Sequence, residues 1–270
     1  GPVDLADIVG GGDGSGNGVK GAGIDPRSGM ARDRTPLTFL DGIEVNRPVA
    51  GPSALVAAVV VPDGRGPVRL IVDGDPIDGI PPTSGQGWDA IRNGPVNAQA
   101  STTTAGIDHA TDGHTILGLH ANAAITFDLA AIRSRHPATR RRFRALVAYG
   151  GRAETVVAEV AVHVDGRRVA HHRLDPSSAG VPLDIPLPDD ARHLTLVATD
   201  GGDGIGHDQI WFGDPRIEGT PSRPVDELAV ARARGRIESL KRELAALPET
   251  ATVYGPVVQA PPPVQLLVRG

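Results

Sequence analysis

Two glycine-rich segments of the chain carry carboxylates in the same hexapeptide pattern. Gly11 to Gly16 reads GGDGSG, and Gly201 to Gly206 reads GGDGIG. Calcium takes six to eight oxygen ligands, and a glycine-rich loop lets backbone carbonyls join carboxylates around one ion. The alternative interpretation is two flexible loops with solvated aspartates. If calcium is bound, we expect it at the second loop, on Asp200, Asp203 and Asp208.

The segment from Gly87 to Gly94 combines a flat aromatic ring with polar side chains, in the order GWDAIRNG. Sugar sites place an aromatic face against the apolar C–H groups of the sugar ring, while planar polar side chains bridge its hydroxyls. This segment therefore predicts a carbohydrate site, unless its tryptophan only fills the end of a sandwich. The predicted members are Trp88, Asp89, Arg92 and Asn93, with His120 and Asn122 as the next candidates.

The nine histidines follow no metal-binding or catalytic motif. His109, His114 and His120 are five and six residues apart, whereas a zinc-protease helix places two histidines four residues apart. His171 and His172 are adjacent, so on a strand they would point to opposite faces. No G-x-S-x-G nucleophile elbow occurs, and a glycosidase carboxylate pair needs geometry to be assigned. We expect structural or surface roles for the histidines, and no enzyme activity.

The elements that must hold these residues are short strands. Over 155–164, alternate valines share one face while Glu159 and His163 face away, which predicts a half-buried strand. Asp165-Gly166 is a two-residue hairpin signal, after which 168–174 returns. Further strands are expected at 37–40, 55–61, 68–72, 183–187, 193–199 and 210–217. Strands at intervals of about 8–12 residues are typical of a β-sandwich or jelly roll.

The C-terminal part of the chain has a different pattern. Apolar residues recur at steps of three and four at Val230, Ala233, Ile237, Leu240, Leu244 and Leu247. This spacing predicts an amphipathic helix over 224–247, either docked on the sandwich or engaged in self-association. The last segment, 250–270, is rich in proline and predicts an extended tail.

Composition limits the class of protein. The chain has 270 residues, 40% of them hydrophobic and only 3% aromatic, so its core must be mainly aliphatic. The chain has 35 glycines and 24 prolines, a share well above the roughly 12% that these two residues make up in an average protein. This composition favours short strands and tight loops. The net charge of −5 argues against a nucleic-acid partner. The chain has no cysteine, which excludes disulfides and thiolate metal sites.

Two further features concern the setting of the chain. No apolar run approaches the roughly 18 residues that a membrane-spanning helix needs. The chain opens with Gly1-Pro2 and no initiating methionine, which reads as the remnant of a protease site. We therefore expect it to be a fragment of something longer.

Four segments, taken in order, resemble an NPCBM domain. They are HANAAITFDL at 120–129, RFRA at 142–145, VHVDG at 162–166, and LTLVATDGGDGIGHDQIW at 194–211. The resemblance covers 106–219. It implies a galactose-binding-like jelly roll and a carbohydrate-binding module of a secreted bacterial protein. Positions of the last motif are occupied by Asp200, Asp203, Asp208 and Trp211.

The flanks resemble a narrower group, the large planctomycete-type surface proteins that join such modules to cytochrome-like domains. The segments concerned are 39–42, 88–96, 253–256 and 266–270. This resemblance implies an extracytoplasmic setting, periplasmic or at the cell surface. It implies no electron-transfer role for this chain.

Together these observations predict an all-β jelly-roll or galactose-binding-like sandwich with one C-terminal helix and an extended tail. Region 1–105 should pack on or complete the sandwich of 106–219, with 220–249 forming the helical part. The expected function is non-catalytic binding of a polysaccharide or glycan, which targets a larger secreted protein and leaves its neighbouring domains as further partners. The alternative is a structural or protein–protein interaction module that binds no sugar.

Overall fold

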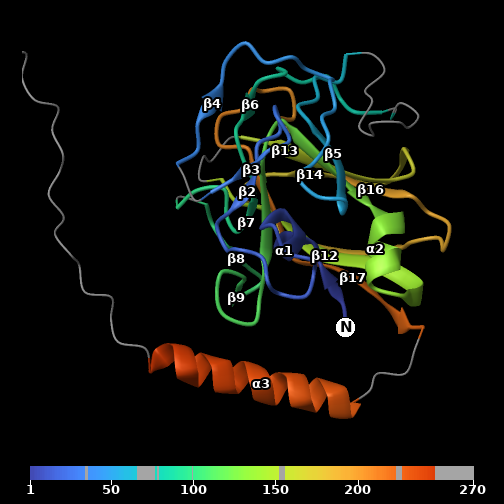
Figure 1. Ribbon diagram of the computed structural model, residues 1–270. Coiled ribbons are helices and arrows are strands. Elements are labelled where there is room, and N and C mark those ends of the chain that lie inside the picture. The colour runs from blue at the N-terminus through green and yellow to red at the C-terminus, as the bar shows by residue number, and fades with distance from the viewer. Residues whose placement is uncertain are drawn as a thin grey trace, which may run out of the picture. The chain divides into compact units, whose positions relative to one another are not determined.

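Antiparallel strands with alternating aliphatic residues make up most of the chain. The computed structural model describes residues 1–33, 36–65, 77, 79–98, 100–151, 156–222 and 227–246. It has two units, Gly1–Arg223 and Pro224–Gly270. The strands of the first unit form two main sheets with a shared core, which confirms the predicted β-sandwich (Figure 1). The predicted strand over 68–72 and the tail over 250–270 lie outside the described residues.

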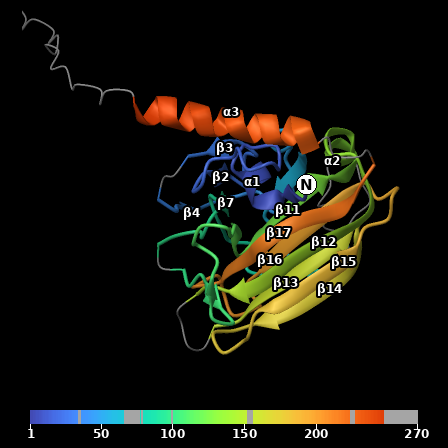
Figure 2. The ribbon, with the colours of Figure 1, turned by 90° about the horizontal axis from the view of Figure 1, so that it is seen from below.

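The larger sheet has the order β15-β12-β17-β10-β7-β2-β3, and β1 also pairs with β17. Its strands are β1 (Val3–Asp4), β2 (Gly23–Ile24), β3 (Ala31–Arg32), β7 (Ile91–Asn93), β10 (Ile116–His120), β12 (Ala138–Tyr149), β15 (Val181–Pro186) and β17 (Gln209–Pro221). Figure 2 shows β17, β12 and β15 side by side. Segments before residue 105 therefore extend the same sheet that the later strands form.

The second sheet has the order β14-β13-β16-β11-β5. Its strands are β5 (Val56–Val60), β11 (Ala123–Asp128), β13 (Ala158–Val164), β14 (Arg167–Leu174) and β16 (His193–Thr199). Two small pairs join β4 (Phe39–Leu40) to β6 (Gly87–Trp88), and β8 (Thr103–Thr104) to β9 (Ile107–Asp108). Between β13 and β14, Asp165 and Gly166 have φ of 48° and 78°, as a tight hairpin turn requires.

The main core lies between the two sheets. Val160 and Leu196 come from the second sheet, while Phe143 and Phe212 come from the larger one, and all four are almost completely buried. Phe143 lies in the arginine-rich stretch of β12, where strand alternation turns its ring into the core.

The prediction that the strand over 155–164 is half-buried was wrong. Every residue of β13 is buried, including Glu159 and His163. A second apolar cluster covers the outer face of this sheet, formed by Val60, Ile77, Ile80, Ala124, Ala161 and Val197. Alternation along one strand shows that its two faces differ, but it does not reveal that a distant segment covers the second face.

Two short helices, α1 (Leu5–Val9) and α2 (Leu129–Arg135), were not predicted. Each begins after an aspartate whose carboxylate accepts hydrogen bonds from the first helical N–H groups. The Asp4 carboxylate accepts from the N–H groups of Ala6 and Asp7, and that of Asp128 accepts from the N–H of Ala131 at 2.8 Å. Both aspartates directly follow short apolar stretches, so a reading of strand alternation overlooks them.

The second unit contains α3 (Glu227–Ala245), which confirms the predicted C-terminal helix. Its apolar side chains are 37% to 69% exposed at Leu228, Val230, Ile237, Leu240 and Leu244. We call this set the α3 stripe.

Among the described residues, no helix is both long enough and apolar enough to cross a membrane.

Candidate functional site

A groove of about 660 Å³ opens beside Trp88, where β6 approaches the end of β10. We call it the Trp88 groove. It is lined by Pro36, Leu37, Trp88, Arg92, Val96, Asn97, Ala98, His120, Gly206, His207 and Gln209. Three of the six residues predicted for a sugar site, Trp88, Arg92 and His120, therefore meet in one place.

An aromatic cluster forms one wall of the Trp88 groove. Trp88 on β6 is paired with Phe39 on β4, whose ring meets the indole edge-on with centroids 5.6 Å apart. The imidazole of His120 also contacts the indole, with centroids 5.2 Å apart and the planes inclined at 43°. These two contacts hold the Trp88 ring, so the groove has a fixed flat surface of the kind that packs against sugar C–H groups.

His120 contributes a hydrogen-bond acceptor to this wall. Its Nδ1 lies 2.9 Å from the carbonyl oxygen of Ala121, and only a protonated Nδ1 can donate to a carbonyl. Burial lowers the pKa of His120 to about 4, so the ring is neutral near pH 7. The Nε2 of a neutral ring protonated at Nδ1 is an acceptor, which suits a donating hydroxyl.

Arg92 and Gln209 add polar groups to the lining of the groove. Arg92 is the middle residue of β7 and is buried between β2 and β10. Burial lowers the pKa of its guanidinium, and the charge of Asp89 opposes that shift. Within the described part of the chain, Gln209 Oε1 and Trp88 Nε1 are buried atoms with no hydrogen-bond partner.

The other three predicted members lie outside the groove. Asp89 is buried, forms an ion pair with Arg32 and accepts a hydrogen bond from the Thr38 N–H at 3.0 Å. Asn93 follows Arg92 on β7, so strand alternation turns it to the opposite face, where its amide donates to the Val19 carbonyl at 3.3 Å. Asn122 is also fully buried, in a hydrogen-bond network described below.

Sequence reasoning missed Asn97, His207 and Gln209 as members of the groove. Gln209 faces His120 in the antiparallel register of β10 with β17, a pairing between residues far apart in the chain. One signal was present, since His207 and Gln209 flank Asp208 within the GHDQIW segment.

A second cavity, of about 330 Å³, adjoins the Trp88 groove at the 95–98 segment. Its lining includes Asn93, His109 and His114. Arg92, Asn97 and Ala98 line both this cavity and the Trp88 groove, so the two spaces share a wall.

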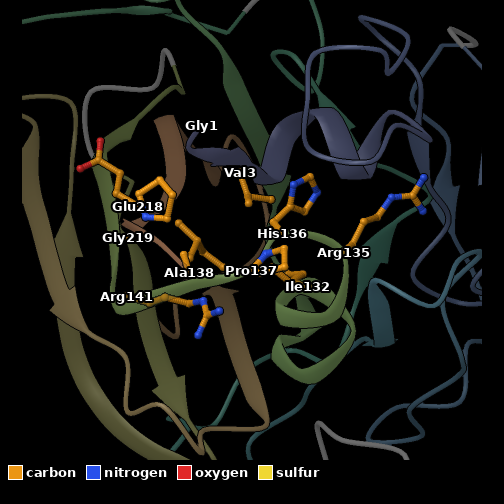
Figure 3. A pocket seen from close by; sticks show the side chains of 12 residues that line it. Gly1, Val3, Ile132, Arg135, His136, Pro137, Ala138, Arg141, Glu218 and Gly219 are labelled. Atoms are coloured by element: carbon orange, nitrogen blue, oxygen red, sulfur yellow. The ribbon is translucent and has the colours of Figure 1, made fainter. Parts of the chain in front are cut away.

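A third cavity, of about 240 Å³, lies between the N-terminus and the end of α2. Figure 3 shows the side chains of Arg135, His136 and Arg141 around it. Its lining contains no phenylalanine, tyrosine or tryptophan. It therefore has no broad aromatic face for a sugar, unlike the Trp88 groove.

Asp200 is fully engaged in a buried hydrogen-bond network. Its Oδ2 accepts from the N–H of Ser84 at 2.9 Å, from Ser84 Oγ at 2.6 Å and from Asn122 Nδ2 at 3.0 Å. Its Oδ1 accepts from the Gly202 N–H at 3.1 Å. Burial alone would raise the pKa of Asp200, but these hydrogen bonds outweigh it and hold the pKa below its ordinary value.

Asp208 is in the opposite situation. Its side chain is 0% exposed, and neither carboxylate oxygen has a hydrogen-bond partner among the described residues. Burial, followed by the charges of Asp203 and Asp200, raises its pKa to about 9. Asp203 lies at the surface, where its Oδ2 accepts from the Val157 N–H at 3.2 Å.

The N–H groups of the first glycine-rich loop donate to a buried carboxylate of the preceding helix. Asp7 on α1 is buried, and its oxygens accept from the N–H of Gly14 at 2.7 Å and from that of Gly18. Asp13, in the middle of the loop, forms an ion pair with Arg135 at 3.3 Å. The loop N–H groups thus satisfy Asp7 without an ion.

The closest grouping of potential metal ligands lies elsewhere than at Asp200, Asp203 and Asp208. In the described ranges, one set of three potential ligand atoms lies mutually within 4.8 Å, and it belongs to His109, His114 and Asp214. Sequence spacing had favoured structural or surface roles for the two histidines.

Comparison with known proteins gives a family and a set of structural likenesses. The family model described as NPCBM/NEW2 domain matches residues 83–218. No curated protein matches the chain.

Several solved structures are similar to part of the chain. The CBM51 module of Clostridium perfringens GH95, solved with methyl-galactose, is 21% identical, with a TM-score of 0.37 over 45% of this chain and 81% of that one. CBM51-2 with the INT domains of Clostridium perfringens ZmpB, solved with GlcNAc, is 17% identical, with a TM-score of 0.34 over 47% and 26%. The tandem CBM51 modules of the Streptococcus pneumoniae family 98 glycoside hydrolase Sp3GH98 are 14% identical, with a TM-score of 0.37 over 48% and 38%.

Proposed function

The chain belongs to the NPCBM/NEW2 domain family, and from that premise we propose that it binds a carbohydrate in the Trp88 groove without cleaving it. The observation that carries the proposal is the convergence of Trp88, His120 and Arg92 on one groove of about 660 Å³. A sugar ring would pack on the indole face. Its hydroxyls would meet the His120 Nε2 acceptor and the Arg92 donors.

Binding without hydrolysis is favoured by the chemistry of the groove. Glycoside hydrolysis ordinarily needs two carboxylic acids flanking the scissile bond. The described residues that line the Trp88 groove include no aspartate or glutamate. The His120 imidazole is neutral near pH 7 and already donates its Nδ1 proton to a backbone carbonyl.

The first experiment is a glycan array, followed by calorimetry of the 270-residue chain with a glycan that binds. Removing an aromatic anchor from a binding site commonly costs about 2 kcal/mol or more, which is roughly thirtyfold in affinity. We expect Trp88→Ala to lose at least that much. Met30→Ala is the matched control, because Met30 is an apolar side chain that is 68% exposed and lies outside the groove.

One result would exclude the Trp88 groove as the sugar site. A Trp88→Ala protein with native circular dichroism and wild-type affinity would place the sugar elsewhere. Binding to no glycan on the array would favour the alternative function given below.

We propose further that calcium supports the loop beside the groove. Asp208 fits this role because a buried carboxylate without partners is stabilised by a cation, and Asp203 lies close enough to raise its pKa. Asp200 supports the loop through Ser84, Asn122 and Gly202 and is the weakest of the three predicted ligands. Running the array with and without calcium tests whether the ion also affects sugar binding.

The setting that fits these properties is a larger exported protein that the module directs to a polysaccharide. On this proposal the chain acts outside the cytoplasm, beside other domains of its parent. The planctomycete-type, cytochrome-associated context belongs to the same proposal. Fractionation of the source cells, with detection of the parent protein on whole cells, would test the location.

The alternative function is a protein–protein interaction module, and the α3 stripe favours it. Five large apolar side chains are exposed along this one helix. Replacing Ile237 and Leu240 together with aspartate should dissociate any oligomer while leaving the first unit folded. Sedimentation of the wild type and of the double variant measures their oligomeric states. A wild type that is already a monomer, like the variant, would exclude self-association through the α3 stripe.

A further inference from the structure

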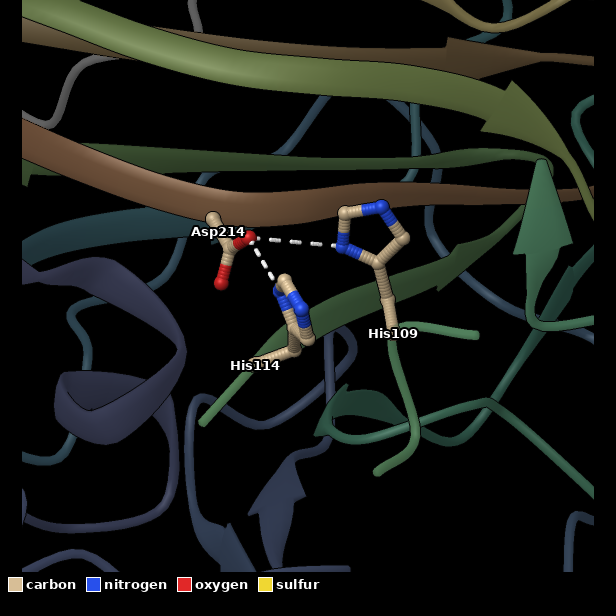
Figure 4. Close-up of side chains that lie close together, drawn as sticks. All are labelled: His109, His114 and Asp214. Carbon is tan, nitrogen blue, oxygen red and sulfur yellow. Dashed lines mark hydrogen bonds and ion pairs between the residues drawn. The ribbon is translucent and has the colours of Figure 1, made fainter. Parts of the chain in front are cut away.

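We propose that His109, His114 and Asp214 bind a divalent transition-metal ion, with zinc as its first candidate. Figure 4 shows the three side chains directed toward one another. The Asp214 Oδ2 lies 2.7 Å from His114 Nδ1 and 3.4 Å from His109 Nδ1. All three ligand atoms lie within 4.8 Å of one another.

These separations suit a metal of the size of zinc. Zinc binds imidazole nitrogen and carboxylate oxygen at about 2.0–2.2 Å in tetrahedral geometry, which places neighbouring ligand atoms about 3.3 Å apart. The 3.4 Å between His109 Nδ1 and Asp214 Oδ2 already has this value. The hydrogen-bonded pair at 2.7 Å must open by about half an ångström. His114 can do so, because its side chain is 34% exposed.

Asp214 is brought to this position by an irregularity in β17. The register of β17 with β12 shifts between Gly213 and Arg216, as at a β-bulge, and Asp214 has a positive φ of 47°. Bulges re-aim single side chains and are frequent near functional sites. Asp214 and Thr115 are also joined by their backbones, since the Asp214 N–H donates to the Thr115 carbonyl at 2.8 Å.

The carboxylate of Asp214 is oriented so that one oxygen remains for a metal. Its Oδ1 accepts from the Thr115 N–H at 3.0 Å and from the Arg216 guanidinium at 3.0 Å. Its Oδ2 faces the two imidazoles. Partners that fix a ligand from behind are a regular feature of metal sites and contribute strongly to affinity.

His109 supplies the independent sign that a ligand belongs here. Its side chain is 4% exposed, yet neither ring nitrogen has a hydrogen-bond partner among the described residues. A buried polar group without a partner is costly and rare, so it calls for an unseen water or ion. Its Nδ1 lies 3.4 Å from Asp214 Oδ2.

The packing around His109 holds its ring in place. Trp211 contacts the ring with centroids 5.2 Å apart. A Cβ atom added at Gly213 would come within 2.6 Å of His109 Nδ1, so the glycine leaves the space that the imidazole occupies. Gly213 directly precedes Asp214 in β17, so the imidazole of His109 packs next to the residue that carries the carboxylate.

The fourth coordination position would face the second cavity. His109 and His114 both line that space of about 330 Å³. Two histidines and one carboxylate with an open position suit zinc, and also nickel, cobalt or iron(II), more than calcium or magnesium, which prefer oxygen ligands.

The test uses the untagged 270-residue chain, stripped of metal and titrated calorimetrically with zinc. We expect one equivalent to bind, and cobalt(II) at the same site to give visible absorption. His109→Gln, His114→Gln and Asp214→Asn should each weaken binding at least tenfold. His172→Gln on β14 is the matched control and should bind zinc as the wild type does.

Two results would overturn the proposal. One is a wild-type chain that binds no stoichiometric zinc, and the other is unchanged binding in the His109→Gln/His114→Gln double variant, which would mean adventitious binding to surface groups. Circular dichroism checks the fold of each variant. If Asp214→Asn fails to fold, the partly exposed His114 still decides the question through its single substitution.

Discussion

The two glycine-rich loops share a hexapeptide pattern but treat their carboxylates in opposite ways. In the first loop, the N–H groups of Gly14 and Gly18 turn inward and donate to the buried Asp7. In the second loop, the buried Asp208 receives no hydrogen bond from any described residue. The same composition therefore gives one site that is satisfied by backbone and one that is left in need of a cation or a proton.

The two loops differ in which carboxylate their N–H groups can reach, and this depends on the neighbouring elements more than on the loop residues. The first loop follows α1 and folds back over it, so its N–H groups meet a carboxylate seven and eleven residues away. The second loop connects β16 to β17, and its own Gly202 N–H is used by Asp200. Glycine content alone is thus a poor guide to metal binding, because a loop that wraps its carboxylate can replace the ion.

The largest expected effect comes from removing the satisfied carboxylate. Asp7→Ala leaves two loop N–H groups without their acceptor, and each unsatisfied buried group costs about 1–3 kcal/mol. We expect the free energy of unfolding in urea to fall by about 2–5 kcal/mol. Asp13→Ala in the same loop removes a partly exposed ion pair with Arg135 and an exposed hydrogen bond from the Ser15 N–H, and should cost less than about 1 kcal/mol. Equal losses in the two variants would contradict the comparison.

An effect of the opposite sign is expected at the second loop. Near pH 7 without calcium the Asp208 carboxyl is protonated in the folded chain, because burial raises its pKa to about 9, but it is ionised in the unfolded chain. Asp208→Asn removes the cost of this protonation, so in strong chelator it should raise the free energy of unfolding by about 1–3 kcal/mol. If calcium binds there, calcium at 100 times its Kd adds about 2.7 kcal/mol to the wild type and nothing to the variant. Thermal melts in chelator and in calcium measure both. A wild-type melting temperature unchanged by calcium would exclude calcium binding at Asp208. The effect of Asp208→Asn in chelator could still be measured.

The third expected effect appears only on acidification and sharpens the comparison through pH. His120 shares the Trp88 groove with Gly206 and His207 of the second loop, and its pKa of about 4 lies below the ordinary 6.5. The unfolded chain therefore binds a proton before the folded chain does, so stability falls as the pH drops from about 6.5 toward 4, by up to about 1.4 kcal/mol per unit. His120→Gln should flatten this slope in urea titrations at several pH values. An identical slope in the variant would assign acid sensitivity to other groups.

Much of the sandwich was predictable because its strands carry the information locally. Alternate valines placed β13, and Asp165-Gly166 placed the turn into β14. The helices α1 and α2 were missed because a single aspartate cap starts each one, and neither exceeds seven residues. Burial of the outer face of β13 depends on Ile77 and Ile80, which lie some eighty residues earlier in the chain.

The candidate site was predictable where neighbours in sequence are also neighbours in space. Trp88 and Arg92 lie four residues apart and reach one groove, whereas Asn93, the next residue after Arg92, points the other way. His109 and His114 were predicted to have structural or surface roles, because their partner Asp214 is a hundred residues from His114 and its position depends on a bulge. No spacing rule along the chain contains that contact.

The wall formed by Arg92, Asn97 and Ala98 has a thermodynamic consequence. These three residues line both the Trp88 groove and the His109–His114 cavity. An occupant of either space that fixes this wall changes the conformational freedom left for the second to restrict, and such linkage is reciprocal. Whatever factor a metal ion contributes to the affinity for sugar, the sugar must return to the affinity for the metal. On the two proposals above, a factor other than one would make glycan affinity depend on the concentration of free metal ion.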